Sequence, residues 1–324
     1  MSAPSIRPRD FLRLDDGSWY AVTAEVTPDG RIPVLERYAP SGRTLAKVPA
    51  VRARGGAVVP ARVREHRMPG PRLRVLRAAG RLASPLERLA VRIAGLLEVH
   101  GVPRERLGVT GSLLISPGRP DSDVDLVVRG RTAFHAARRA VVSLLLEGTL
   151  QPLDAAAWEA AWRRRASAID LEAYRAHERR KFTRALLDGV RLDLTMVPDE
   201  AELAEEPRCA AVEGRHTLTA TVLDATRAFD HPARLVVAHP AVQEVVVWTN
   251  TYVGQAFEGE TIEAAGVLER DALGRRRLVV GTSRAAPGEW VVVPALTSRA
   301  PGTPRSADPR APGPPSPRTP APAR

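Results

Sequence analysis

The segment SDVDLVV, residues 122–128, constrains the fold of this chain more than any other stretch. Its apolar residues predict a buried strand, and Asp123 and Asp125 stand two positions apart within it. Side chains at i and i+2 of a strand point to the same face, so both carboxylates are expected to leave the sheet on one side. Held about 6–7 Å apart, they form a base for hard divalent cations, which prefer oxygen ligands.

A second strand of this kind is predicted in VRLDLTMVP, residues 190–198. Its apolar side chains alternate with polar ones, which places Asp193 and Arg191 on the polar face. If the strand lies beside the first one in register, Asp193 supplies a third carboxylate next to Asp123 and Asp125. The alternative is an exposed strand residue without a role at the site.

A Gly-Ser pair, Gly111 and Ser112, stands in LGVTGSLLI, which is predicted to be a strand at residues 107–115. Glycine lets the backbone approach a phosphate closely, and the N–H groups and the serine hydroxyl that follow are donors for phosphate oxygens. The proline-bounded segment SPGRP comes directly after, so any helix that begins at the Gly-Ser pair is expected to be short. Asp121 is expected to order this loop.

Taken together, these motifs resemble the DNA polymerase beta-type nucleotidyltransferase superfamily. Its pattern is a small-residue pair, a spacer, an Asp-x-Asp strand and a later lone carboxylate on a neighbouring strand. Here the spacer from Ser112 to Asp123 is eleven residues, and the resemblance covers residues 84–198. The phrases GVTGSLLI, SDVDLVV and GQAFEGETIEAAGVLE also look like a group of uncharacterised, mostly archaeal, predicted nucleotidyltransferases.

The resemblance implies a role for each of these residues. Gly111 and Ser112 would hold the β- and γ-phosphates of a nucleoside triphosphate such as ATP. Asp123 and Asp125 would bind two Mg²⁺ or Mn²⁺ ions, and Asp193 would bind the metal that activates the attacking hydroxyl. The implied reaction is in-line attack on the α-phosphorus, with pyrophosphate leaving.

A basic segment, YRAHERRKFTRALL, comes just before the Asp193 strand. A helical stretch is predicted from Trp158 to Leu187, and on it Arg180 and Lys181 are the residues expected to reach the triphosphate. Arginine forks and lysine charges both suit phosphate oxygens. The alternative is a solvated basic helix face.

The expected fold class is α+β, with four segments. Residues 1–77 read as a small β-rich domain and basic linker, and residues 78–213 as a nucleotidyltransferase α/β domain with a mixed sheet. Residues 214–297 read as a small antiparallel, barrel-like β domain, and residues 298–324 as a disordered Pro/Arg tail. Within the central segment, Ser84, Pro85 and Glu87 predict a capped helix start.

The net charge of +11 favours an anionic partner, such as a nucleotide or an RNA or DNA acceptor. Coding bias towards arginine and a basic tail are the plainer account of part of that charge. The single cysteine, Cys209, excludes an internal disulfide. No apolar stretch approaches the length that spans a bilayer, so no membrane partner is expected and the cytoplasm is the expected location.

Two functions remain open from the sequence. The first is a Mg²⁺-dependent enzyme that transfers a nucleoside monophosphate to a hydroxyl on a nucleic-acid 3′ end, a protein side chain or a small molecule. The second is a nucleotidyltransferase fold without turnover that binds nucleic acid or a partner. The presence of all three carboxylates favours the enzyme, because an inactive copy has no need for Asp193.

Overall fold

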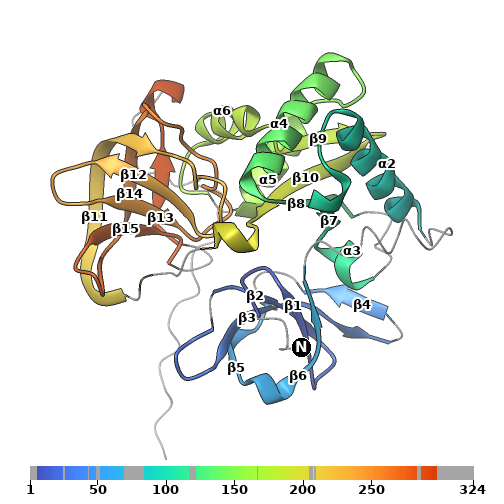
Figure 1. The fold of residues 1–324 in the computed structure, drawn as a ribbon, viewed down its shortest axis with the longest axis horizontal. Helices are drawn as coiled ribbons and strands as arrows, with labels where there is room; N and C mark the ends of the chain where they lie inside the picture. Colours follow the sequence, from blue (N-terminus) through green and yellow to red (C-terminus); the bar gives the residue numbers. More distant parts are fainter. Residues whose placement is uncertain are drawn as a thin grey trace, which may run out of the picture.

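The described part of this computed structural model is mixed α+β and contains three sheets, which confirms the predicted class (Figure 1). It comprises residues 6–24, 26–42, 44–48, 52–68, 84–116, 122–165, 167–203, 207, 209–282 and 286–297. The predictions for the 69–83 part of the basic linker, for Asp121 and for the 298–324 tail fall outside these residues. No helix among them is long and apolar enough to cross a membrane.

The first sheet is antiparallel throughout, as predicted for the N-terminal segment. Its turns at Asp16-Gly17 and Pro28-Asp29-Gly30 place Gly17 at φ 79° and Gly30 at φ 77°, which only glycine adopts without strain. The strands are β1 (Phe11–Leu14), β2 (Trp19–Val22), β3 (Ile32–Ser41), β4 (Thr44–Lys47), β5 (Gly55–Val58) and β6 (Val63–Arg67).

The central sheet is mixed and has the order β7-β8-β10-β9, with β8 and β10 parallel to each other. Its strands are β7 (Leu107–Val109), β8 (Val124–Arg129), β9 (Arg184–Leu187) and β10 (Val190–Val197). The alternation predicted for residues 190–198 is confirmed, because Leu192, Leu194 and Met196 are buried. The helices are α2 (Pro85–Val99), α3 (Ser112–Ile115), α4 (Arg131–Leu146), α5 (Ala155–Arg165) and α6 (Leu171–Lys181).

The start of α2 shows the predicted capping box. The Glu87 N–H donates to Ser84 Oγ at 3.1 Å, and the Ser84 N–H donates to Glu87 Oε2 at 2.9 Å. These two bonds satisfy donors that the first helical turn would otherwise leave unpaired. Both α2 and α4 pack against β8 and so hold the strand that carries Asp123 and Asp125 at its start.

Two sequence predictions for the central segment are wrong in detail. The single helix predicted from Trp158 to Leu187 is broken into α5, α6 and β9, because Asp170 caps a new helix and Phe182 ends it at φ 51°. Residues 107–115 are not one strand either. The chain turns at Gly111, with φ 62°, and continues as the four-residue α3, whose shortness was predicted from SPGRP.

The third sheet forms a closed ring, because β11 pairs with β14 as well as β12 in the order β11-β12-β13-β15-β14-β16. It is not purely antiparallel, since β13 and β15 run parallel. The first strand also begins at residue 209, so the expected boundary at 214 falls inside it. The strands are β11 (Cys209–Asp224), β12 (Ala233–Ala238), β13 (Glu244–Val247), β14 (Thr261–Asp271), β15 (Arg276–Val280) and β16 (Trp290–Val292).

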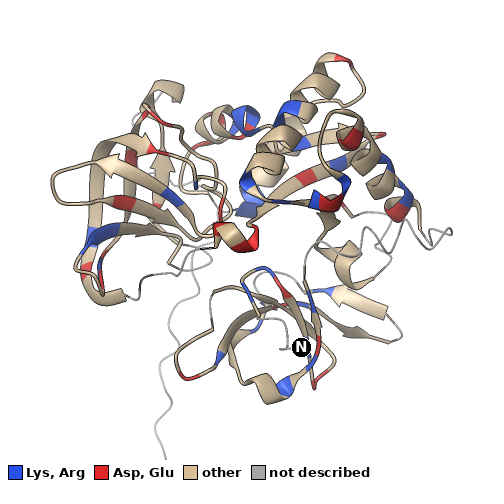
Figure 2. Cartoon of the chain, in the orientation of Figure 1, with Lys and Arg blue, Asp and Glu red and all other residues tan. Residues whose placement is uncertain are grey.

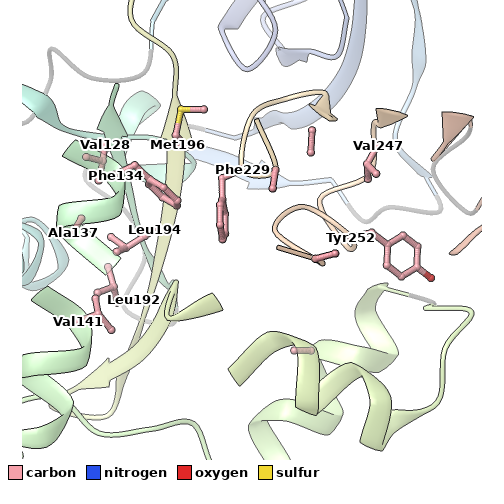
Figure 3. Packing of buried hydrophobic residues seen from close by; sticks show 14 of the residues in the cluster. Val128, Phe134, Ala137, Val141, Leu192, Leu194, Met196, Phe229, Val247 and Tyr252 are labelled. Atoms are coloured by element: carbon pink, nitrogen blue, oxygen red, sulfur yellow. The ribbon is translucent and has the colours of Figure 1, made fainter. Parts of the chain in front are cut away.

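The central unit and this C-terminal barrel share one hydrophobic core. Phe134 of α4 and Phe229 of the barrel side face each other with ring centroids 5.2 Å apart (Figure 3). The N-terminal sheet has its own core, and a smaller cluster joins it to α3 through Leu114 and Ile115. The barrel therefore supports the central sheet from one side, while the N-terminal sheet contacts it at α3.

His177 on α6 links the helix to the barrel and predicts a pH dependence of stability. Its Nδ1 donates to the Ala173 carbonyl at 2.7 Å, and its Nε2 accepts the Val293 N–H at 3.0 Å. Burial lowers the pKa of His177 to about 4. The unfolded chain binds this proton near pH 6.5, so the stabilisation is complete above that pH and is lost as the pH falls toward 4.

We therefore expect the free energy of unfolding to fall between pH 7 and pH 5, with about 2 kcal/mol of the loss due to His177. The variant His177→Gln should lose that share of the slope in urea unfolding at the two pH values. The control is His216→Gln, which replaces an exposed histidine outside α6. An unaltered slope in His177→Gln would contradict the assignment.

Candidate functional site

Two parallel strands bring the three predicted carboxylates together. In the β8–β10 pair, Asp193 stands directly opposite Asp125, and Asp123 lies two residues before Asp125 on the same face. The adjacency that the sequence left open is therefore present. Asp123 and Asp125 lie at the start of β8 and Asp193 lies within β10, and the other face of both strands is packed into the core.

Arg191 places a positive charge between two of these carboxylates. Its Nε donates to Asp193 Oδ2 at 3.0 Å, and its Nη2 lies 2.9 Å from the same oxygen. The same Nη2 also donates to Asp123 Oδ2. One guanidinium thus offsets the repulsion between Asp123 and Asp193, and the arginine stands two residues before Asp193 on the polar face of β10.

A second arginine holds the other oxygen of Asp193. Arg184 Nε donates to Asp193 Oδ1 at 2.8 Å, while its Nη1 contacts Tyr174 at 3.1 Å and also pairs with Glu178. Burial acts to raise the pKa of Asp193, but the charges of Arg184 and Arg191 outweigh it and hold that pKa below its usual value. Asp193 is therefore ionised and fixed in orientation.

Asp125 has the opposite environment. Burial, together with the negative charges of Asp193 and Asp123, raises the pKa of Asp125 to about 7, and these effects outweigh the charges of Lys47 and Arg191, which lower it. Burial also raises the pKa of Asp123. Among the residues that the structure describes, no side chain forms an ion pair with Asp125. A proton or an added cation would therefore stabilise this carboxyl.

Gly111 leaves the space that Asp125 occupies. A Cβ atom on Gly111 would lie 2.2 Å from Asp125 Oδ2, and its φ of 62° is unfavourable for other residues. Gly111 thus lies against the Asp-x-Asp strand. Ser112 follows at the start of α3. The close approach of Asp125 and the positive φ therefore require glycine at position 111, in addition to any contact with phosphate.

Arg180 and Lys181, which were expected to face the triphosphate, both make contacts with the barrel side. Arg180 donates to both oxygens of Glu260 at 2.6 Å and lies 4.3 Å from the Phe257 ring centroid. Lys181 is buried, pairs with Glu178 and lies 3.3 Å from a barrel carbonyl. The barrel covers this part of α6, so both cations fasten α6 in place.

Figure 2 shows both basic and acidic positions over the central unit. In the described part of the chain, no set of three or more His, Cys, Asp and Glu side chains is arranged to hold a metal ion. The Arg191 guanidinium lies between Asp123 and Asp193 and bonds to both. The oxygen donors themselves are of the type that Mg²⁺ and Mn²⁺ prefer.

Comparison with known proteins gives one clear relative. The chain is 34% identical over 225 residues to Uncharacterized protein MJ1086 of Methanocaldococcus jannaschii, and the match covers 64% of this chain. The chain likewise spans 64% of that relative's length. No family model matches the chain, and no solved structure matches it. The superfamily resemblance therefore stays a prediction from the sequence motifs.

We expect Gly111→Ala to destabilise the fold through both strain and a clash with Asp125. Gly148 offers a matched control, because it has φ 74° and a Cβ atom added there would meet nothing within 4 Å. Gly148→Ala should cost about 1 kcal/mol by urea unfolding, and Gly111→Ala about 1–3 kcal/mol more. The double variant with Gly111→Ala and Asp125→Ala should recover the stability that Gly111→Ala loses in excess of Gly148→Ala. Equal costs for the two glycines would contradict the close packing.

Arg191 should compete with cations for the carboxylates. We expect Arg191→Met to lower the free energy of unfolding by about 3 kcal/mol in EDTA, because two carboxylates lose their counter-charge. Mn²⁺ should then raise the melting temperature of this variant more than that of the unaltered protein. The exposed pair of Arg92 and Asp188 gives the control Arg92→Met. An equal response to Mn²⁺ in all three proteins would exclude competition.

Proposed function

We propose that this chain is a metal-dependent nucleotidyltransferase that moves a nucleoside monophosphate from a nucleoside triphosphate to a hydroxyl acceptor. The observation that carries the proposal is the convergence of Asp123, Asp125 and Asp193 on one face of two parallel strands, against Gly111. The residues that meet are up to 82 positions apart in the sequence (193 − 111), and the sequence left open whether the two strands are neighbours. Structural ion pairing alone does not require an unpaired third carboxylate.

The environment of Asp125 supports a cation site. A carboxyl whose pKa is raised by burial and by two neighbouring carboxylates is stabilised when a divalent ion binds to it. Asp123 and Asp125 would hold Mg²⁺ or Mn²⁺, two ions per site, with Asp193 as the third ligand. Bound ions of this kind supply charge neutralisation for attacking and leaving oxygens in phosphoryl transfer.

The chain's own residues supply orientation. Arg184 fixes Asp193 through one carboxylate oxygen, and Gly111 permits the backbone before α3 to lie against Asp125. In the proposed reaction the acceptor hydroxyl attacks the α-phosphorus in line, and pyrophosphate leaves. Binding of ions requires the Arg191 side chain to give up Asp123, after which its charge is free for the phosphates.

The acceptor in this proposal is a nucleic-acid 3′ end. The net charge of +11 supports an anionic macromolecule, since basic surfaces raise both the affinity and the association rate for nucleic acids. A protein or small-molecule hydroxyl is the other acceptor class. The residues that bind the nucleotide do not depend on this choice.

A second candidate function is a binding module without turnover. The observation that favours it is Arg191, which compensates Asp123 and Asp193 without any metal. In that case the carboxylates and arginines form a structural network, and the fold serves as a platform for nucleic acid or a partner. The two functions differ in whether label moves from nucleotide to acceptor.

The experiment uses each nucleoside triphosphate with α-phosphate label, Mg²⁺ or Mn²⁺, and separate RNA, DNA and protein acceptors. We expect Asp123→Asn and Asp193→Asn to reduce label transfer about 100-fold or more, because both remove charge at the transition state. Asp188→Asn, at the turn five residues before Asp193, should retain transfer. Nucleotide or nucleic-acid binding with no transfer, unaltered in Asp123→Asn, would support the binding module instead.

A further inference from the structure

The N-terminal sheet is docked at the candidate site through α3. Tyr38 packs in one cluster with Leu114 and Ile115, which stand two and three residues after Ser112. Arg67 strengthens the contact, since its Nη1 donates to the Leu114 carbonyl at 2.8 Å. Figure 1 shows β4 lying next to α3 at this junction. The N-terminal sheet therefore approaches the same side of the central sheet as the carboxylates.

The geometry of β4 directs Lys47 toward this junction. Lys47 stands opposite Tyr38 in the β3–β4 pairing, and directly opposed residues of antiparallel strands share a face. Leu45, two residues before Lys47 and on the same face, packs against the cluster that contains Leu114 and Ile115. Lys47 continues that face beyond the packed region and is exposed.

The charges at this junction agree with the geometry. The positive charge of Lys47 acts to lower the pKa of both Asp123 and Asp125, although burial of these carboxyls dominates. In turn, burial raises the pKa of Tyr38 to about 12, and the charge of Asp125 adds to that rise. Among the described residues, Lys47 forms no ion pair, so its charge is available to a ligand.

The choice of lysine here is itself informative. The chain has 48 basic residues, and Lys47 and Lys181 are its two lysines. Lys181 is enclosed in an ion pair with Glu178, where a compact ammonium fits. Lys47 is exposed beside the carboxylates, and a flexible stem with a point charge can follow an anionic group of the substrate.

We infer that Lys47 binds the polyphosphate of the nucleotide, so that the N-terminal sheet forms one wall of the nucleotide site. This inference rests on the proposed function and extends it to a residue outside the central unit. Lys47 acts in substrate binding and positioning, because the carboxylates already account for the cation ligands. The phosphate oxygens supply acceptors for its three N–H groups.

The test measures binding of inorganic triphosphate and of each nucleoside triphosphate by calorimetry in Mn²⁺, with the full chain. We expect Lys47→Met to weaken both about tenfold, the scale of one charge-assisted contact, and Lys47→Arg to retain most of the affinity. The control Arg37→Met removes an equal charge from the residue next to Tyr38, on the opposite face of β3, and should leave both affinities unchanged. In the transfer assay, Lys47→Met should raise KM with little change in kcat.

The outcomes distinguish failure of the role of Lys47 from failure of the proposed function. If the unaltered chain binds triphosphate and Lys47→Met binds it equally well, the role of Lys47 is overturned and the proposed function stands. If the unaltered chain binds neither inorganic nor nucleoside triphosphate, the proposed function fails and the inference fails with it. An equal loss in Arg37→Met would also overturn the inference, since it would show a general effect of net charge.

Discussion

The parallel pairing of β8 with β10 is the constraint on which the site depends. It sets Asp193 opposite Asp125 and leaves Asp123 on the same face, so three negative charges share a small volume. Such a group is unfavourable unless positive charge is supplied. Arg184 and Arg191 supply it for Asp193 and Asp123, whereas Asp125 is left with a raised pKa. This difference between the carboxylates indicates that an added cation would stabilise Asp125 the most.

The rest of the molecule holds these two strands in register. One core runs from the central helices into the C-terminal barrel, and α6 is fastened to the barrel by Arg180, Lys181 and His177. Since α6 also carries Glu178, which pairs with Arg184, the barrel helps to orient the arginine that fixes Asp193. The C-terminal barrel, which the sequence analysis treats as a separate domain, therefore helps to support the site.

Much of the site could be predicted because its signals are local. A period of two places Asp123 with Asp125, and the same period places Asp193 and Arg191 on one face of β10. The roles of Arg180 and Lys181 could not be predicted, because they depend on the barrel that covers α6. The helix predicted from Trp158 to Leu187 is interrupted at the single residues Asp170 and Phe182. The composition of the segment does not show where these interruptions lie. The approach of Lys47 depends on packing between segments distant in sequence.

Arg191 connects stability with function at this site. Without a cation, its guanidinium lowers the cost of holding Asp123 near Asp193 and keeps the two strand ends in place. Under the proposed function the same contact would oppose cation binding, since an ion would have to displace it from Asp123. An arginine suits this dual demand, because its planar fork can bridge two carboxylates and can also turn to a phosphate. In the proposed reaction the positive charge would then stay within the site while its partner changes, which would limit the electrostatic cost of the exchange.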